Sequence, residues 1–91
     1  MAEPSVWQIV IHRKAEKILR CLDGNPSQRI RQAIRKLSID PRPTGVKKLT
    51  GYENLFRIRV GDWRIIYAIE DDRLIVLVLE ISPRGGAYRD L

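Results

Sequence analysis

The stretch Leu55–Tyr67, with the sequence LFRIRVGDWRIIY, decides the fold that this chain can adopt. Side chains along a strand alternate between its two faces, so Arg57 and Arg59 point the same way. The following Gly61-Asp62 pair suits a two-residue turn of type II′, because glycine accepts the positive φ angle of the first turn position. Such a turn places Arg59 directly opposite Arg64 on the returning strand. The stretch therefore predicts a β-hairpin with three arginines on one face.

The other face of this hairpin is apolar and is predicted to be the core side. It carries Phe56, Ile58, Val60, Trp63, Ile65 and Tyr67. Like charges in cross-strand register destabilise a sheet, so we expect a polyanion to satisfy the arginine face. A guanidinium donates two parallel hydrogen bonds, which suits a phosphate group. The hairpin thus predicts the protein core on one face of the sheet and a cationic site on the other face.

The length and charge of the chain limit its organisation and its partners. With 91 residues there is room for one core, so a single domain spanning residues 1–91 is expected. The 17 Lys+Arg against 11 Asp+Glu give a net charge of +6, which favours nucleic acid, an anionic membrane surface or an acidic protein as partner.

The single cysteine cannot form an internal disulfide, and the first residues lack a signal-peptide pattern. We therefore expect a cytoplasmic protein. The longest apolar run, Leu74–Leu79, is far shorter than the roughly 20 residues of a membrane span, so no membrane-spanning segment is expected.

A strand and two helices are predicted before the hairpin. Val6–Ile11 is a β-branched, alternating run that is typical of a first strand. Arg13–Leu22 and Asn25–Ile39 have apolar residues at helical spacing and are predicted to be amphipathic helices. Gly24 is expected to cap the first helix, and Asn25-Pro26-Ser27-Gln28 is a helix-start signal for the second.

Two further segments are predicted to complete the sheet. Val46–Leu49 can form a short edge strand, and Leu74–Ile81 is apolar on both faces, as in a strand covered on both sides. If Ile69 pairs with Leu74, Glu80 falls on the core side, so we expect a register slip or a β-bulge near the strand end. The expected fold is α+β, with a small antiparallel sheet of four main strands packed against an N-terminal helix pair, in the order β-α-α-β-β-β.

The residues needed for metal or nucleophile sites are scarce. One histidine, one cysteine and scattered acids do not supply a metal site, and His12 alone does not support a Ser-His-Asp site, so no cofactor is expected. His12 is more simply explained as a residue at a helix start. What remains is an all-cationic site that binds phosphates and stabilises a pentacoordinate phosphorus. Its candidate residues are Arg57, Arg59, Arg64, Arg84 and the aromatic Tyr88.

The other basic residues have a simpler alternative to RNA binding. A solvated helix face is the commoner role for charged residues such as Arg29, Arg31, Arg35 and Lys36. Lys47 and Lys48 fit a loop role and a place beside the arginine face equally well. Cys21, beside the first helix stripe, is interpreted as a small apolar filler.

Several segments together resemble a known family. Gly45–Leu49, Leu55–Tyr67, Arg84 and Ala87–Arg89 resemble the RelE-like branch of the RelE/ParE toxin superfamily, the toxins of bacterial and archaeal type II toxin–antitoxin modules. The resemblance covers nearly the whole chain, because the leading strand and helix pair also fit. It implies a metal-independent endoribonuclease that cuts messenger RNA in the decoding site of the ribosome. It also implies a cognate acidic antitoxin and a toxin–antitoxin hetero-oligomer.

The resemblance also implies roles for individual residues. Arg57, Arg59 and Arg64 match the basic hairpin positions, while Arg84 and Tyr88 match a C-terminal arginine and tyrosine. The 2′-hydroxyl of the messenger would attack the adjacent phosphate, with Tyr88 stacking on or orienting the substrate. The remaining residues expected at the RNA are Lys47, Lys48, Arg29, Arg31, Arg35, Lys36 and Arg89.

Two departures from the family pattern leave the general base unassigned. Both basic positions of the first hairpin arm are arginine here, and a pKa above about 12 makes arginine a poor base. A histidine that many relatives carry just before the C-terminal arginine is replaced by Pro83. Two other functions therefore stay open: a ParE-type toxin that inhibits DNA gyrase without cleaving RNA, and a degenerate member that only binds RNA or its antitoxin. The combination of arginines and tyrosine favours the endoribonuclease.

Overall fold

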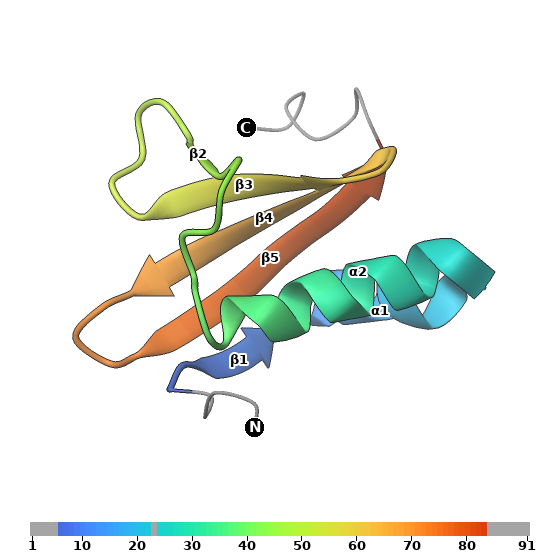
Figure 1. Cartoon of the computed structure of the whole chain (residues 1–91), viewed down its shortest axis with the longest axis horizontal. Coiled ribbons are helices and arrows are strands. Elements are labelled where there is room, and N and C mark those ends of the chain that lie inside the picture. Colours follow the sequence, from blue (N-terminus) through green and yellow to red (C-terminus); the bar gives the residue numbers. More distant parts are fainter. Residues whose placement is uncertain (1–5, 23, 84–91) are drawn as a thin grey trace.

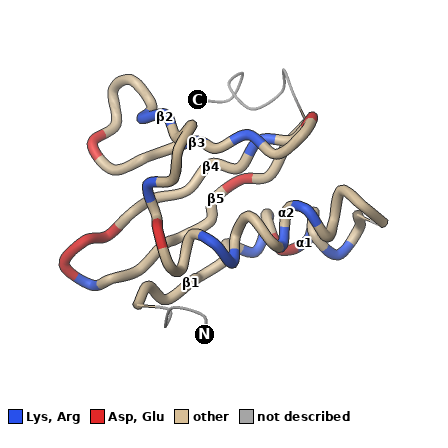
Figure 2. Tube along the Cα trace, in the orientation of Figure 1, with Lys and Arg blue, Asp and Glu red and all other residues tan. Residues whose placement is uncertain are grey.

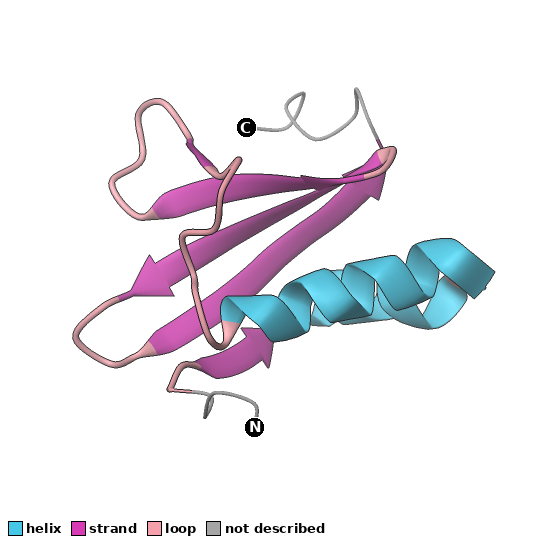
Figure 3. Ribbon diagram, viewed as in Figure 1, coloured by secondary structure: helices cyan, strands magenta, loops and turns pink. Residues whose placement is uncertain are grey.

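A computed structural model gives the fold of the chain and describes residues 6–22 and 24–83. In these residues a helix pair packs against one face of a five-stranded sheet (Figure 1, Figure 3). The elements in chain order are β1 (Gln8–Ile11), α1 (Arg13–Cys21), α2 (Gly24–Leu37), β2 (Lys47–Lys48), β3 (Leu55–Val60), β4 (Trp63–Glu70) and β5 (Ile75–Pro83). The strand order across the sheet is β1-β5-β4-β3-β2. The predicted α+β class and element order are confirmed, with β2 as the additional short edge strand.

The sheet is mixed rather than wholly antiparallel. β1 runs parallel to β5, with Gln8 beside Ile75 and Ile11 beside Val78. The β2–β3, β3–β4 and β4–β5 pairs are antiparallel. Tight turns force β3, β4 and β5 to alternate in direction, whereas β1 reaches the sheet through the helix pair and is free to pair in either direction. The expectation of a fully antiparallel sheet therefore fails only at β1.

The two predicted helices are present, with shifted ends. α1 ends at Cys21 with Leu22 as its cap, and α2 spans Gly24–Leu37 instead of Asn25–Ile39. Gly24, with a φ of 71°, therefore begins α2 and does not cap α1. In residues 6–22 and 24–83, neither helix combines the length and apolar character needed to cross a membrane.

His12 caps the N-terminus of α1. Its Nδ1 accepts a hydrogen bond from the backbone N–H of Lys14, at 3.2 Å. The first backbone N–H groups of a helix lack partners within the helix, so this contact satisfies one of them. The interpretation of His12 as a residue of the helix start is confirmed.

The core lies between the helix pair and one face of the sheet. Its buried members are Ala15, Leu19, Ile30, Ile34, Leu37, Phe56, Ile58, Ile65, Tyr67, Ile69, Val76, Val78 and Ile81. Val60 and Trp63 are partly buried and pack against this cluster. Each large aliphatic or aromatic side chain buried in this way contributes about 1.5–3 kcal/mol to folding before entropy is counted. The predicted apolar faces of both helices and of the hairpin are confirmed.

The central hairpin has the predicted register. Val60 pairs with Trp63 and Arg59 pairs with Arg64, so the connecting turn contains two residues. Gly61 has a φ of 60°, the left-handed conformation that glycine adopts without steric cost. The turn therefore fixes which side chains of β3 and β4 face each other.

The turn between β4 and β5 lies one residue later in the chain than predicted. Leu74 lies in this turn with a φ of 55°, and β5 begins at Ile75. Ile69 consequently pairs with Val76 and not with Leu74. The sequence did not predict this, because a leucine in the left-handed region has no local signal.

A β-bulge then changes the register inside the β4–β5 pair. Tyr67 pairs with Val78, but the preceding residue of β4, Ile66, pairs with Glu80. Leu79 is thus an extra residue in β5. The predicted irregularity is confirmed, and it moves Glu80 to the sheet face that the helices leave open.

The connection between α2 and β2 is held against the sheet. The Tyr67 hydroxyl donates a hydrogen bond to the Pro41 carbonyl at 2.8 Å, inside the protein. Arg42 donates two hydrogen bonds to the Asp71 carboxylate, at 3.1 and 2.9 Å, and its guanidinium lies 5.3 Å from the centroid of the Phe56 ring. The hydrogen bond from Arg42 lowers the pKa of Asp71, and burial raises the pKa of Tyr67 above its usual range. These contacts fix the start of the loop that continues beside β3.

Replacing Ile34 by aspartate tests the assignment of the core face. Ile34 is 5% exposed, so the new carboxylate would be buried without a partner, and we expect the free energy of unfolding to fall by about 3 kcal/mol or more. Gln32→Asp, on the exposed side of the same helix, should change it by less than about 0.5 kcal/mol. Urea denaturation of both variants measures the difference, and equal losses would contradict the assignment.

Replacing Tyr67 by phenylalanine tests the contact that holds the α2–β2 connection. The buried Pro41 carbonyl loses its donor, and we expect a loss of about 1–3 kcal/mol in the free energy of unfolding. Tyr52→Phe is the matched control, because the Tyr52 side chain is exposed. A Tyr67→Phe protein as stable as the control protein in thermal and urea unfolding would show that this hydrogen bond adds nothing.

Candidate functional site

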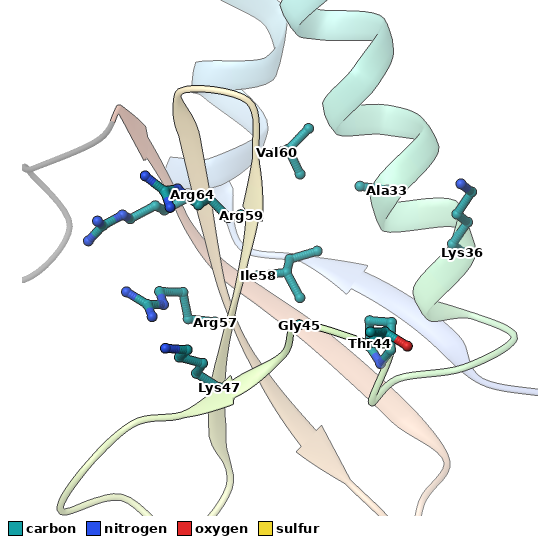
Figure 4. A pocket seen from close by; sticks show the side chains of 11 residues that line it. Ala33, Lys36, Thr44, Gly45, Lys47, Arg57, Ile58, Arg59, Val60 and Arg64 are labelled. Carbon is teal, nitrogen blue, oxygen red and sulfur yellow. The ribbon is translucent and has the colours of Figure 1, made fainter.

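Three arginines and one lysine project from the open face of the sheet. Arg59 lies directly opposite Arg64, and Arg57 lies two residues away on the same strand. Lys47 of β2 pairs with Arg57 and shares its face. Figure 4 shows these four side chains on the same side of β3, turned away from α2. We call Lys47, Arg57, Arg59 and Arg64 the cationic cluster.

Lys48 does not join the cationic cluster. It pairs with Phe56, whose side chain belongs to the core face. Neighbouring residues on a strand point to opposite faces, so Lys48 projects away from Lys47. Of the two lysines that the sequence could not separate, only Lys47 lies beside the arginines.

A cleft of about 600 Å³ runs along β3 and connects the cationic cluster with the helix layer (Figure 4). It is lined by Ala33, Lys36, Pro43, Thr44, Gly45, Ile58, Val60 and the cationic cluster. β2 pairs only with Arg57 and Phe56, so within the described residues the cleft follows the part of β3 that β2 does not cover. The loop fixed by Tyr67 and Arg42 supplies the wall opposite β3.

The geometry of the cationic cluster favours an anionic ligand. Arg57 and Arg64 are partly buried, and Arg59 is exposed. Directly opposed side chains on adjacent strands have Cβ atoms about 5 Å apart, a separation at which like charges repel. An anion with several oxygens relieves this repulsion and accepts hydrogen bonds from more than one guanidinium.

The carboxylate of Glu80 shares the face of the cationic cluster. Glu80 pairs with Ile66, and Ile66 pairs on its other side with Arg57. Figure 2 shows the acidic segment of β5 beside the basic segments of β3 and β4. Sequence reasoning did not place Glu80, because an uninterrupted register puts it in the core. The available signal was the high cost of burying an unpaired carboxylate, which made that register improbable.

Two basic residues of α2 serve contacts within the fold. Arg31 donates hydrogen bonds to the Ser27 hydroxyl at 3.2 Å and to the Leu19 carbonyl at 3.5 Å, which links α2 to α1. Arg29 lies against the hairpin turn, where a Cβ on Gly61 would come within 3.0 Å of its guanidinium. Neither residue lines the cleft.

The other predicted site residues fall in three places. Lys36 lines the cleft on the α2 side, and Arg35 is exposed in the last turn of α2. Arg84, Tyr88 and Arg89 lie outside the described residues. In residues 6–22 and 24–83, His, Cys, Asp and Glu side chains form no group of three or more that could hold a metal ion.

Comparison with protein families gives one match over most of the chain. A profile described as the ParE toxin of type II toxin–antitoxin systems (parDE) matches residues 9–88. The RelE1 protein of Methanocaldococcus jannaschii is 29% identical over 87 residues, which span 92% of this chain and 97% of that protein.

Solved structures share the fold. A chain of the archaeal RelE–RelB complex from Pyrococcus horikoshii matches with a TM-score of 0.79 and 30% identity, covering 90% of this chain and 99% of that chain. A chain of the RelBE2 complex of Mycobacterium tuberculosis matches with a TM-score of 0.74 and 22% identity, covering 86% and 98%. The isolated RelE toxin of E. coli matches with a TM-score of 0.77 and 18% identity, covering 90% and 88%. The last two comparisons concern the fold alone. The chain belongs to the ParE toxin family of type II toxin–antitoxin systems and is a RelE-like toxin within it.

Proposed function

We propose that this toxin is a ribosome-dependent endoribonuclease that cleaves messenger RNA without a metal ion. The observation that carries the proposal is the cationic cluster on the open face of the sheet, next to a cleft of about 600 Å³. Arg57, Arg59 and Arg64 can hold one or two phosphates through paired N–H donors. A messenger strand on this face would bring a scissile phosphate among them.

The proposed reaction is an attack of the 2′-hydroxyl on the adjacent phosphate. Negative charge on the phosphoryl oxygens increases as the pentacoordinate phosphorus forms, and fixed guanidinium groups stabilise it without rearranging. Arg64 is proposed to make this contact. From the family resemblance we propose Arg84 beside the leaving oxygen and Tyr88 against a base. Lys36 and Lys47 are proposed to bind neighbouring phosphates.

An acidic antitoxin is the proposed partner. The relatives from Pyrococcus horikoshii and Mycobacterium tuberculosis were solved as toxin–antitoxin complexes. The net charge of +6 and the cationic cluster favour an acidic chain, and one that covers the cluster would exclude RNA. We propose a toxin–antitoxin hetero-oligomer in the cytoplasm, where the ribosome is the target of the free toxin.

A ParE-type inhibitor of DNA gyrase is the second candidate. The family profile that matches residues 9–88 is named after ParE, which favours this alternative. Such a toxin acts by binding and breaks no RNA bond. The two functions therefore differ in whether an arginine of the cationic cluster affects a chemical step or only an affinity.

Replacing Arg64 by alanine separates catalysis from binding. If Arg64 stabilises the pentacoordinate phosphorus, single-turnover cleavage of ribosome-bound message by saturating toxin should slow by about 10²-fold or more. Binding of the toxin to the ribosome should change little. Arg73→Ala, in the exposed turn between β4 and β5, is the matched control and should cleave at the wild-type rate. An Arg64→Ala toxin that cleaves normally once bound would reduce the cationic cluster to a docking surface.

A further inference from the structure

We propose that Glu80 is the general base that accepts the proton of the attacking 2′-hydroxyl. This inference rests on the proposed endoribonuclease function and names a group that the cationic cluster itself does not supply. An arginine keeps its proton below about pH 12, so it does not act as a base at neutral pH. A glutamate has an ordinary pKa of about 4.3 and is ionised under the same conditions.

The β-bulge is what puts Glu80 on the functional face. Tyr67 pairs with Val78, and continuing that register without the bulge would set Leu79 opposite Ile66. Glu80 would then lie opposite Ile65, inside the core. Because Leu79 is an extra residue, Glu80 instead pairs with Ile66 and faces the same side as the cationic cluster. Bulges of this kind re-aim a side chain and are enriched next to active sites.

The neighbours of Glu80 are set by the strand order. β4 lies between β5 and β3, so Glu80, Ile66 and Arg57 form one row across the sheet. Two strand spacings separate the Cα atoms of Glu80 and Arg57 by about 10 Å, a gap that the two long side chains span from either side. Arg64 pairs with Ser82, which places it diagonally from Glu80, at a spacing of roughly 7–8 Å.

The centre of this row is buried although it lies on the open face of the sheet. Ile66 belongs to the open face, yet it is 2% exposed and is not a member of the core cluster. Glu80, Arg57 and Arg64 are partly buried, and all three are engaged by partners in the folded chain. The bulge thus places a partly buried carboxylate on the sheet face that carries the cationic cluster. Phosphate binding alone does not explain the Glu80 carboxylate, because a carboxylate and a phosphate repel each other.

The proposed step forms one bond to phosphorus and breaks another. The 2′-oxygen forms a bond to phosphorus, and its proton passes to the Glu80 carboxylate. The bond between phosphorus and the 5′-oxygen breaks, and that oxygen leaves with the electron pair and takes a proton from solvent. The products are a 2′,3′-cyclic phosphate and a 5′-hydroxyl, and Glu80 returns its proton to solvent. No oxidant, reductant or metal ion takes part.

Three variants test Glu80 under single-turnover conditions on ribosome-bound message. Glu80→Gln keeps the shape and removes the base, and we expect cleavage to slow by about 10²-fold or more with ribosome binding retained. Glu70→Gln is the matched control, because Glu70 lies on the same face at the far end of β4, and it should cleave at the wild-type rate. Glu80→Ala opens space for an added carboxylate. Formate and acetate, at constant ionic strength, should restore its cleavage, and the more basic acetate should restore more per bound molecule.

The outcomes separate a base from a group that only positions the arginines. Rescue that rises with the basicity of the added carboxylate supports Glu80 as the base, since proton transfer depends on basicity. Rescue that is the same for both carboxylates, or no rescue in a folded variant that binds the ribosome, overturns the inference. So does a Glu80→Gln toxin that cleaves within about threefold of wild type. A wild-type toxin that cleaves no message refutes the proposed function itself, and Glu80 fails with it.

Discussion

The structure depends on the alternation of side chains in the hairpin Leu55–Tyr67. One set of alternate residues is buried against the helix pair, so the other set must face away from it. A shift of one residue between the two strands would put Arg57 and Arg59 on the face of Ile65 and Tyr67, and would separate them from Arg64. The Gly61 turn prevents that shift by fixing Arg59 opposite Arg64. The same constraint that gives the domain its core therefore gathers the cations at one place.

The helix layer and the α2–β2 connection turn this flat charged face into a cleft. Ala33 and Lys36 of α2 line the cleft, and residues 43–45 of the connection line it as well. Tyr67 links these parts, because its ring belongs to the core and its hydroxyl holds the carbonyl of Pro41. Stability and site geometry are coupled through this residue. We expect substitutions in the connection to alter activity without touching a charged group.

The sequence predicted most of the fold, because strong local signals agreed with one another. The hairpin register followed from two-residue turn chemistry, and the helices followed from apolar periodicity. What it could not predict came from contacts between distant segments: the parallel direction of β1, the role of Gly24, and the turn that contains Leu74. In the candidate site, the structure tests only which side chains share a face. The arginine face was correct, whereas the separation of Lys47 from Lys48 needed the observed pairing of β2.

Glu80 illustrates why one residue of the open sheet face could not be placed from sequence. Local pattern put it in the core, and only the cost of that placement indicated a bulge. Mapping the ends of a translated message after incubation with toxin and purified ribosomes tests whether this face cuts RNA. We expect breaks within the codon held in the decoding site, with 2′,3′-cyclic phosphate and 5′-hydroxyl ends, only when ribosomes are present. An intact message, together with inhibition of DNA gyrase by the same protein, would contradict that expectation.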